Sequence, residues 1–290
     1  MPKEPLRTLL SILLILLIGG AVAWAGSQGG TAVDGWPVFG ICAAISFSLN
    51  AVVFLHAYRF RTERFFDLTG SITYLVLLAS ALLLTNSVSA RDLILAGMIA
   101  CWAIRLGSFL FSRVTRDGAD GRFDRVKFQP LQFLMWWILQ GLWVLLTAAC
   151  ALAAISSSAS PPLGAFAAIG CGLWLLGMVI EIVSDEQKKD FRKRPENHGG
   201  FIKTGLWAWS RHPNYFGEIT LWAGIAVIAL PALSGWQLAT LISPLFVYFL
   251  LTRISGIPIL EARAKRRWGD ESEFQKYLKH TPILFPRPPR

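Results

Sequence analysis

The sequence predicts an all-α, polytopic integral membrane protein with about eight transmembrane helices. Of its 290 residues, 54% are hydrophobic and only 16% charged, whereas soluble domains are about half apolar and a quarter charged. The mean hydropathy is +0.49, and the apolar residues gather in runs about as long as a bilayer core requires. These features exclude a disordered chain, a coiled coil and a small disulfide scaffold.

The first four apolar runs cover residues 8–26, 36–58, 68–86 and 92–112. The first follows Lys3 and Arg7 and has some features of a signal peptide. Its length and the seven runs behind it favour an uncleaved span, although seven spans are possible if it is dispensable. The other three are predicted as spans because each is close to 20 residues long and is bounded by charged or polar segments.

The remaining four runs cover residues 131–155, 163–184, 214–234 and 236–257. A basic segment precedes the fifth run, and a short loop with two prolines separates it from the sixth. The seventh follows Pro213, and the eighth ends near Arg253, where charged residues begin. A basic tail completes the chain.

The positive charges predict the orientation of these spans. All but two of the 28 lysines and arginines fall in residues 1–7, 59–67, 113–130 and 185–213 or from Arg253 onward. These segments lie on one side if the spans alternate, and cytoplasmic loops collect Lys and Arg. Both termini are therefore predicted to be cytoplasmic, and the net charge of +10 is explained by topology without a nucleic-acid partner.

The four cysteines all fall inside predicted spans, with no paired spacing and no nearby histidine cluster. We interpret them as small buried apolar residues, and the sequence predicts no metal site. There is no internal repeat, so one membrane domain is expected over residues 1–290. Within it, residues 1–174 would shape a substrate cavity on the lipid side and residues 175–290 would bind a cofactor.

Ionisable residues at membrane depth are costly and usually face a cavity or a partner. Arg105, Glu181 and Glu218 are the clearest cases. The two glutamates lie about one turn from the cytoplasmic face, where they could simply pair with arginines of the loops. Glu181 leaves both interpretations open, and the neighbours of Glu218 favour a functional role.

The segment 181–218 is the richest in chemistry. Glu181, Asp185, Lys189 and Arg192 share one face of a helix that leaves the membrane. The loop behind them contains further basic, Gly, Trp and Asn residues. Arg and Lys suit phosphate oxygens, Asn and Glu suit ribose and carboxamide groups, and aromatic rings suit stacking. This inventory fits an anionic nucleotide, whereas a purely lipid-facing basic loop is the alternative.

The segment 210–218 (SRHPNYFGE) resembles the C-terminal signature of the steroid 5α-reductase family and, more distantly, that of the sterol C14 and Δ7 reductases. The resemblance covers about residues 175–286 and includes Tyr277 and the closing segment 281–286 (TPILFP). The N-terminal half is similar only to an uncharacterised, mainly bacterial branch of the family. That similarity rests on segments 65–71 (FFDLTGS), 105–107 and 117–123.

The resemblance implies NADPH bound in a pocket that faces the cytoplasm and a hydride delivered to a conjugated carbon–carbon double bond. It also implies a hydrophobic steroid-like or isoprenoid substrate that enters from the bilayer. The clustered bases favour NADPH over NADH. Carried over by position, the cofactor-binding residues would be Asp185, Lys189, Arg192, Arg194, Asn197, Asn214, Tyr215 and Glu218, with Arg211, His212 and Glu261 closing the site.

The sequence departs from the family at the residues that would donate a proton to the substrate. The Gln-Glu pair of the eukaryotic-type enzymes is absent, and the position of their tyrosine is taken by Trp102. Asp67 and Tyr74, on about the same face of the third span, are the candidate catalytic residues because a general acid must reach the developing enolate. Their structural alternatives are a helix cap for Asp67 and a packing aromatic for Tyr74.

Three other functions compete with the reductase. Isoprenylcysteine carboxyl methyltransferases also carry Arg-His-Pro-x-Tyr-x-Gly before a span, but S-adenosylmethionine has no phosphate for the face that Asp185, Lys189 and Arg192 form. A non-catalytic, lipid-binding member would explain the missing proton donors. A transporter is disfavoured because the chain has no repeat symmetry. We expect a protein of the bacterial inner membrane, with substrate and membrane lipids as partners and no nucleic acid.

Overall fold

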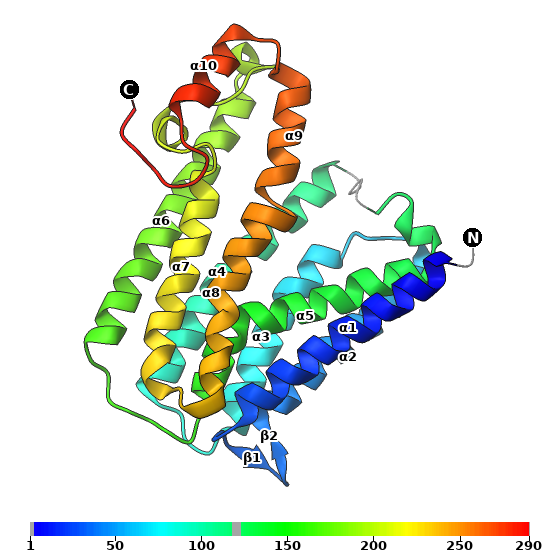
Figure 1. Cartoon of the computed structure of the whole chain (residues 1–290), viewed down its shortest axis with the longest axis vertical. Helices are drawn as coiled ribbons and strands as arrows, with labels where there is room; N and C mark the ends of the chain where they lie inside the picture. The colour runs from blue at the N-terminus through cyan, green and yellow to red at the C-terminus, as the bar shows by residue number, and fades with distance from the viewer. Residues whose placement is uncertain (1–2, 118–122, 290) are drawn as a thin grey trace. The chain divides into compact units, whose positions relative to one another are not determined.

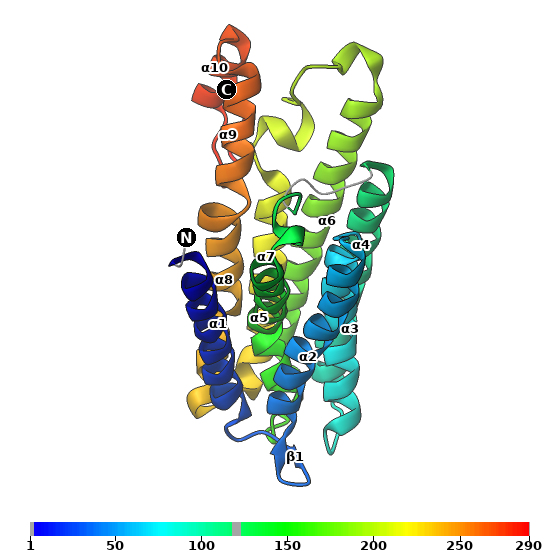
Figure 2. The same cartoon turned by 90° about the vertical axis from the view of Figure 1, so that its right-hand side faces the viewer.

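A computed structural model describes residues 3–117 and 123–289, and they are predominantly helical (Figures 1 and 2). Eight helices in this part of the chain are long and apolar enough to cross a membrane, which confirms the predicted all-α membrane fold. Residues 118–122, within the segment 117–123, lie outside the described residues. The first half comprises α1 (Lys3–Ser27), β1 (Ala32–Val33), β2 (Trp36–Pro37), α2 (Val38–Phe60), α3 (Phe66–Leu84), α4 (Ala90–Asp117), η1 (Val126–Phe128) and α5 (Pro130–Ile155).

The second half begins with α6 (Ala165–Lys193), a helix of 29 residues. It runs past the predicted end of the sixth span, so the face from Glu181 to Arg192 belongs to one continuous helix, as predicted. The last candidate span, Gly235–Trp268, is built from several pieces. The elements are α6, η2 (Pro195–Asn197), η3 (Gly205–Ala208), α7 (Pro213–Ala229), η4 (Leu230–Ala232), η5 (Gly235–Leu241), α8 (Ile242–Phe249), the π-helical η6 (Leu250–Ile254), α9 (Ile257–Trp268) and α10 (Ser272–His280).

Local sequence signals explain several helix ends. Pro130 begins α5 and Pro213 begins α7, because proline lacks the N–H that would be unsatisfied there and its φ suits a helix. Before α4, the backbone N–H and the hydroxyl of Ser89 both donate to one carboxylate oxygen of Asp92, at 2.8 and 2.7 Å. Helix α2 ends at Arg61, whose φ of 53° is left-handed.

The chain divides into two compact units, which are described separately. Unit 1 comprises Met1–Ala167 and Ile228–Ser243, and unit 2 comprises Ala168–Val227 and Pro244–Arg290. In unit 1, α5 packs against α1, α2, α3 and α4, and 89% of its most apolar window is buried. A helix that is apolar on all sides is suited to such a central position.

A few polar side chains join the helices of unit 1. Ser46 on α2 donates to the Gly141 carbonyl on α5 at 2.8 Å, and Gln140 donates to the Phe66 carbonyl at 2.7 Å. Asn50 donates to the Thr73 hydroxyl at 3.2 Å. Interhelical hydrogen bonds of this kind fix the register between membrane helices that apolar packing alone would leave free.

Arg91 is one of the two basic residues outside the predicted cytoplasmic segments, and the structure explains its position. It is only 2% exposed. Its guanidinium donates to the carbonyls of Ile228 (3.1 Å), Pro161 (2.7 Å) and Pro162 (3.0 Å). A buried guanidinium is tolerated when its donors are satisfied, so Arg91 ties the loop after α5 and the end of α7 to the start of α4 within unit 1.

In unit 2, α6 and α7 approach each other at two pairs of glycines. A Cβ atom on Gly177 would lie 2.5 Å from the Gly217 carbonyl oxygen, and one on Gly224 would lie 2.6 Å from the Gly170 carbonyl oxygen. The two glycines are seven residues apart in each helix and pair in antiparallel order. Small residues at such a repeat let membrane helices pack with their backbones in contact.

Candidate functional site

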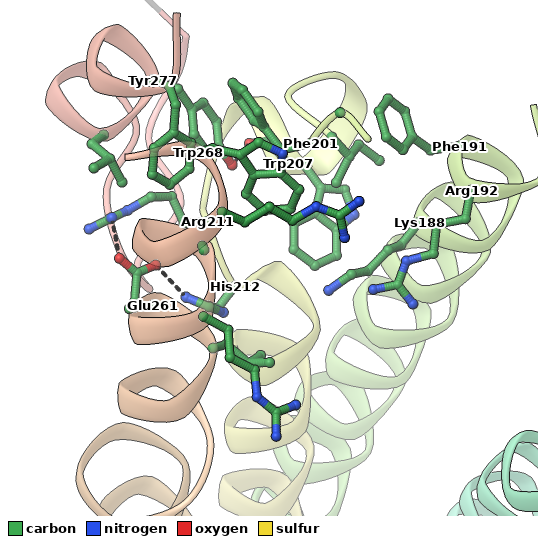
Figure 3. Close-up of a pocket in the computed structure, with 18 residues that line it drawn as sticks. Lys188, Phe191, Arg192, Phe201, Trp207, Arg211, His212, Glu261, Trp268 and Tyr277 are labelled. Atoms are coloured by element: carbon green, nitrogen blue, oxygen red, sulfur yellow. Dashed lines mark hydrogen bonds and ion pairs between the residues drawn. The ribbon is translucent and has the colours of Figure 1, made fainter. Parts of the chain in front are cut away.

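A cavity of about 300 Å³ lies within unit 2 (Figure 3). Its walls come from the C-terminal end of α6, residues 200–212 before α7, residues 260–268 of α9, and α10. Its size is at the lower end of the range of ligand pockets. The lining residues are Lys188, Phe191, Arg192, Gly200, Phe201, Ile202, Trp207, Arg211, His212, Leu260, Glu261, Arg263, Ala264, Arg267, Trp268, Phe274, Tyr277 and Leu278.

The lining combines cationic groups with aromatic rings. Lys188 and Arg192 come from α6, and Arg263 and Arg267 come from α9. The Nζ atom of Lys188 lies 4.5 Å from the centroid of the Trp207 ring, a cation–π distance. Only one carboxylate is found among the described residues of the lining, and it already binds two other residues. The cavity therefore has a net positive charge that would attract an anionic ligand.

That carboxylate belongs to Glu261 and joins α9 to the start of α7 (Figure 3). One oxygen accepts a hydrogen bond from Arg211 Nη1 at 2.6 Å, and the other lies 2.9 Å from His212 Nε2. The side chains of Arg211, Glu261 and His212 are 11%, 20% and 6% exposed. Charge-assisted bonds of this length in a mostly buried site are strong, so the three residues form one rigid group.

His212 presents its second ring nitrogen as an acceptor. Burial lowers the pKa of its imidazole from the usual value, and the hydrogen bond to Glu261 only partly opposes that effect. The ring is therefore neutral at pH 7, with Nε2–H donating to Glu261 and a lone pair on Nδ1. Nδ1 is buried and has no hydrogen-bond partner among the described residues. Because His212 lines the cavity, Nδ1 is placed to accept a hydrogen bond from a ligand N–H or O–H.

Because His212 is buried and neutral in the folded protein, we expect the free energy of unfolding to decrease at acidic pH. Its folded pKa is lowered by burial, with Lys188 and Arg211 also disfavouring the cation and Glu261 favouring it. The unfolded chain therefore takes up this proton first as the pH falls below about 6.5. We expect the thermal midpoint of the purified protein to fall between pH 7 and 5 more steeply for the wild type than for His212→Gln. Parallel curves for the two proteins would contradict the assignment.

The segment that carries Trp207 and Arg211 is held in place by hydrogen bonds. Trp207 Nε1 donates to the Ser184 carbonyl on α6 at 3.0 Å, and the Tyr277 hydroxyl donates to the Trp207 carbonyl at 2.8 Å. Burial raises the pKa of Tyr277, so its hydroxyl stays protonated as a donor. The Arg211 N–H donates to the Pro282 carbonyl at 2.9 Å. These bonds give Tyr277 and the closing 281–286 segment a positioning role.

The structure gathers only part of the predicted cofactor-binding set in this cavity. Arg192, Arg211, His212 and Glu261 line it, and the Tyr215 ring stacks on His212 with centroids 5.7 Å apart and an interplanar angle of 9°. Among residues that do not line it, Lys189 pairs with Glu186 at 2.9 Å, and Asn197 donates to the Phe191 carbonyl at 2.9 Å. The others are Arg194, which is exposed, and Asp185, Asn214 and Glu218, which are half-buried.

Sequence reasoning missed Lys188, Trp207, Trp268, Arg263 and Arg267, all of which line the cavity. The helical period contained a signal for the first of them. Lys188 precedes Arg192 by four residues and shares its face, whereas Lys189 is rotated by about 100°. On α9, the spacing of four residues places Arg263 and Arg267 on one face of the helix. The sequence does not show that this face lines the cavity, because that depends on which elements pack opposite it.

The two candidate catalytic residues lie on α3 in unit 1. Asp67 is half-buried in the first turn of α3. Tyr74 is 6% exposed, and its ring packs edge-on against Trp102 with centroids 5.4 Å apart. Tyr74 therefore lies directly beside Trp102, which the sequence resemblance places at the family's tyrosine position. Their catalytic role stays a prediction.

The fold and the cavity together define an all-α integral membrane protein whose unit 2 contains a cationic, aromatic-lined cavity. The chain belongs to the family described as protein of unknown function (DUF1295), whose profile matches residues 53–281. No solved structure matches the chain.

Curated relatives connect this family to steroid reductases, as the sequence resemblance predicts. The chain is 36% identical over 118 residues to 3-oxo-5-alpha-steroid 4-dehydrogenase 1 of Rattus norvegicus, covering 40% of each protein. It is 32% identical over 118 residues to the protein of that name in Homo sapiens, covering 41% of the chain and 40% of the relative. An uncharacterized protein of Schizosaccharomyces pombe is 25% identical over 200 residues, covering 59% of the chain and 58% of that protein. The chain thus spans about two fifths of the length of the steroid dehydrogenases.

Proposed function

We propose that the protein is an NADPH-dependent membrane reductase that saturates a carbon–carbon double bond conjugated to a ketone in a hydrophobic, steroid-like or isoprenoid substrate. The observation that carries the proposal is the cavity in unit 2. Four cationic side chains from α6 and α9 line it together with one carboxylate, which already binds Arg211 and His212, and aromatic rings form much of the wall. The similarity to proteins named 3-oxo-5-alpha-steroid 4-dehydrogenase 1 supports the reaction class.

The residues of the cavity fit a phosphorylated nucleotide in chemical type. Lys188, Arg192, Arg263 and Arg267 would hold phosphate oxygens, and the Trp268 ring would stack on a base or a nicotinamide ring. The buried Nδ1 of His212 would accept a hydrogen bond from an amide or hydroxyl group. NADPH, when bound, supplies the hydride, and the protein's task is to orient it and to exclude water.

Reduction of the enone places a hydride on the β-carbon and a proton on the α-carbon. The enolate formed on the substrate needs a donor that becomes deprotonated in the same step. We propose Asp67 and Tyr74 for this proton transfer. The proximity of Tyr74 to Trp102 supports the second candidate, because a hydroxyl borne by the neighbouring helix would replace the tyrosine that the sequence lacks.

The test is thermal stabilisation of the detergent-purified protein by NADPH, NADH and S-adenosylmethionine side by side, because a ligand that binds the folded state raises apparent stability. We expect the largest rise with NADPH. Arg192→Ala should weaken NADPH binding about tenfold, the loss typical of one charge-assisted contact. Arg266→Ala is the matched control, because Arg266 is exposed, does not line the cavity and is not among the predicted cofactor-binding residues, and it should leave the affinity unchanged.

The other outcomes separate the competing functions. A rise with S-adenosylmethionine alone would replace the reductase by a methyltransferase. No rise with any of the three ligands would leave the lipid-binding alternative. The cavity itself disfavours the methyltransferase, since S-adenosylmethionine carries no phosphate to balance the cations on α6 and α9.

A further inference from the structure

A second cavity, of about 440 Å³, lies elsewhere in unit 2 and shares no lining residue with the first. It runs between the last span, from α8 to the start of α9, and the C-terminal segment 282–287. We call it the C-terminal groove. Its lining residues are Tyr248, Thr252, Arg253, Ile257, Pro282, Ile283, Leu284, Phe285 and Arg287.

The length of the last span indicates the depth of the groove. The candidate span Gly235–Trp268 has 34 residues, or about 50 Å at 1.5 Å per residue, whereas the hydrocarbon core is about 30 Å thick. Arg253 is the first charged residue in this span, and several more follow it in α9. The hydrocarbon region must therefore end near Arg253, which places the groove at the level of the lipid headgroups.

The groove combines an apolar wall with two arginines that have no acidic partner among the residues that the structure describes. Ile257 and Leu284 form buried parts of the wall, and Phe285 is 62% exposed. Arg253 and Arg287 are exposed, and no ion pair or side-chain hydrogen bond joins either of them to another described residue. Arginine pairs well with phosphate, so the chemistry of the groove suits an anion with an apolar tail.

The backbone at the groove departs from regular α-helix. Residues Leu250–Ile254 form a π-helical turn, in which the Ser255 N–H donates to the Leu250 carbonyl at 2.9 Å. A single π turn shifts the side chains that follow it around the helix and is often found at functional sites. Here the turn contains Thr252 and Arg253, both of which line the groove.

We propose that the C-terminal groove binds one anionic phospholipid, with its phosphate between Arg253 and Arg287 and an acyl chain along Ile257, Leu284 and Phe285. The bilayer supplies this ligand at the same depth as the groove. The assignment goes beyond the proposed reductase and does not depend on it, because the groove and the first cavity have no residue in common.

The test titrates the detergent-purified protein with phosphatidylglycerol and, separately, with phosphatidylcholine of identical short acyl chains, and follows the thermal midpoint. We expect a saturable rise with phosphatidylglycerol and a much smaller one with phosphatidylcholine. Arg253→Gln and Arg287→Gln should each weaken the apparent affinity for phosphatidylglycerol about fivefold, the factor for about 1 kcal/mol per arginine near a lipid surface. If the two losses add in free energy, the double variant should weaken it about 25-fold.

Arg266→Gln is the matched control, because Arg266 is an exposed arginine of α9 that lines neither cavity. An equal loss in this control would overturn the proposal in favour of non-specific attraction. Equal shifts by the two lipids would also overturn it, as would an equal shift by inorganic phosphate alone. The response to NADPH, measured on the same variants, should be unchanged, which separates this result from the proposed function.

Discussion

Replacing Glu261 by alanine is expected to destabilise the protein by about 3 kcal/mol, because breaking a buried ion pair leaves its partner charge uncompensated. Glu261 accepts hydrogen bonds from both Arg211 and His212, and the two partner side chains are only 11% and 6% exposed. The NADPH response should also be lost, since His212 would no longer be held in one tautomer. Denaturant unfolding and the NADPH-induced thermal shift measure the two effects.

Two further variants distinguish charge from shape. Glu261→Gln keeps the volume of the side chain and one acceptor oxygen, so it should retain more stability than Glu261→Ala while still releasing one of the two partners. Glu271→Gln is the control, because Glu271 is exposed at the start of α10 and makes no side-chain cap hydrogen bond. If Glu261→Ala and Glu271→Gln unfolded at the same denaturant concentration, the bridge would contribute nothing to the site.

The membrane fold was predictable because hydrophobic length is a strong signal and the bilayer leaves few alternatives. The arrangement of the helices was not. Every span is apolar, so the sequence alone does not single out α5 as the central helix of unit 1. The π turn at Leu250–Ile254 was equally hidden, because it breaks the helical hydrogen-bond pattern without a proline inside the turn.

The predicted residues that line the cavity are mostly those with a sequence motif around them, whereas the lining on α6 and α9 depends on helical phase. Arg211 and His212 are in the 210–218 motif, and both line the cavity. On α6, Lys188 lines the cavity and the predicted Lys189 does not, because the predicted face was set from Glu181 and not from the partner helices. Arg267 on α9 is part of no recognisable motif, so its place in the lining of the cavity is seen only in the folded structure.

Replacing Gly177 by alanine is expected to destabilise unit 2 by about 3 kcal/mol, because overpacking against rigid atoms is costly. The added Cβ would lie 2.5 Å from both the Gly217 carbonyl oxygen and the Leu221 backbone nitrogen. These are backbone atoms, which cannot relieve the clash by changing rotamer as a side chain can. The clash is therefore relieved only if α6 and α7 move apart. Because Lys188 lies on α6 and His212 directly precedes α7, separation should also weaken NADPH binding. Unfolding and the NADPH-induced shift are again the measurements.

Gly172→Ala supplies a control on the same helix and with the same chemical change. A Cβ atom on Gly172 would meet nothing within 4 Å, so alanine there should be neutral or stabilising by up to about 1 kcal/mol through its better helix propensity. The difference between the two variants isolates the contact between the helices from the intrinsic cost of glycine. If both variants proved equally stable, α6 and α7 would not be packed backbone to backbone at the Gly177–Gly217 pair, and the cavity would need another explanation for its rigidity.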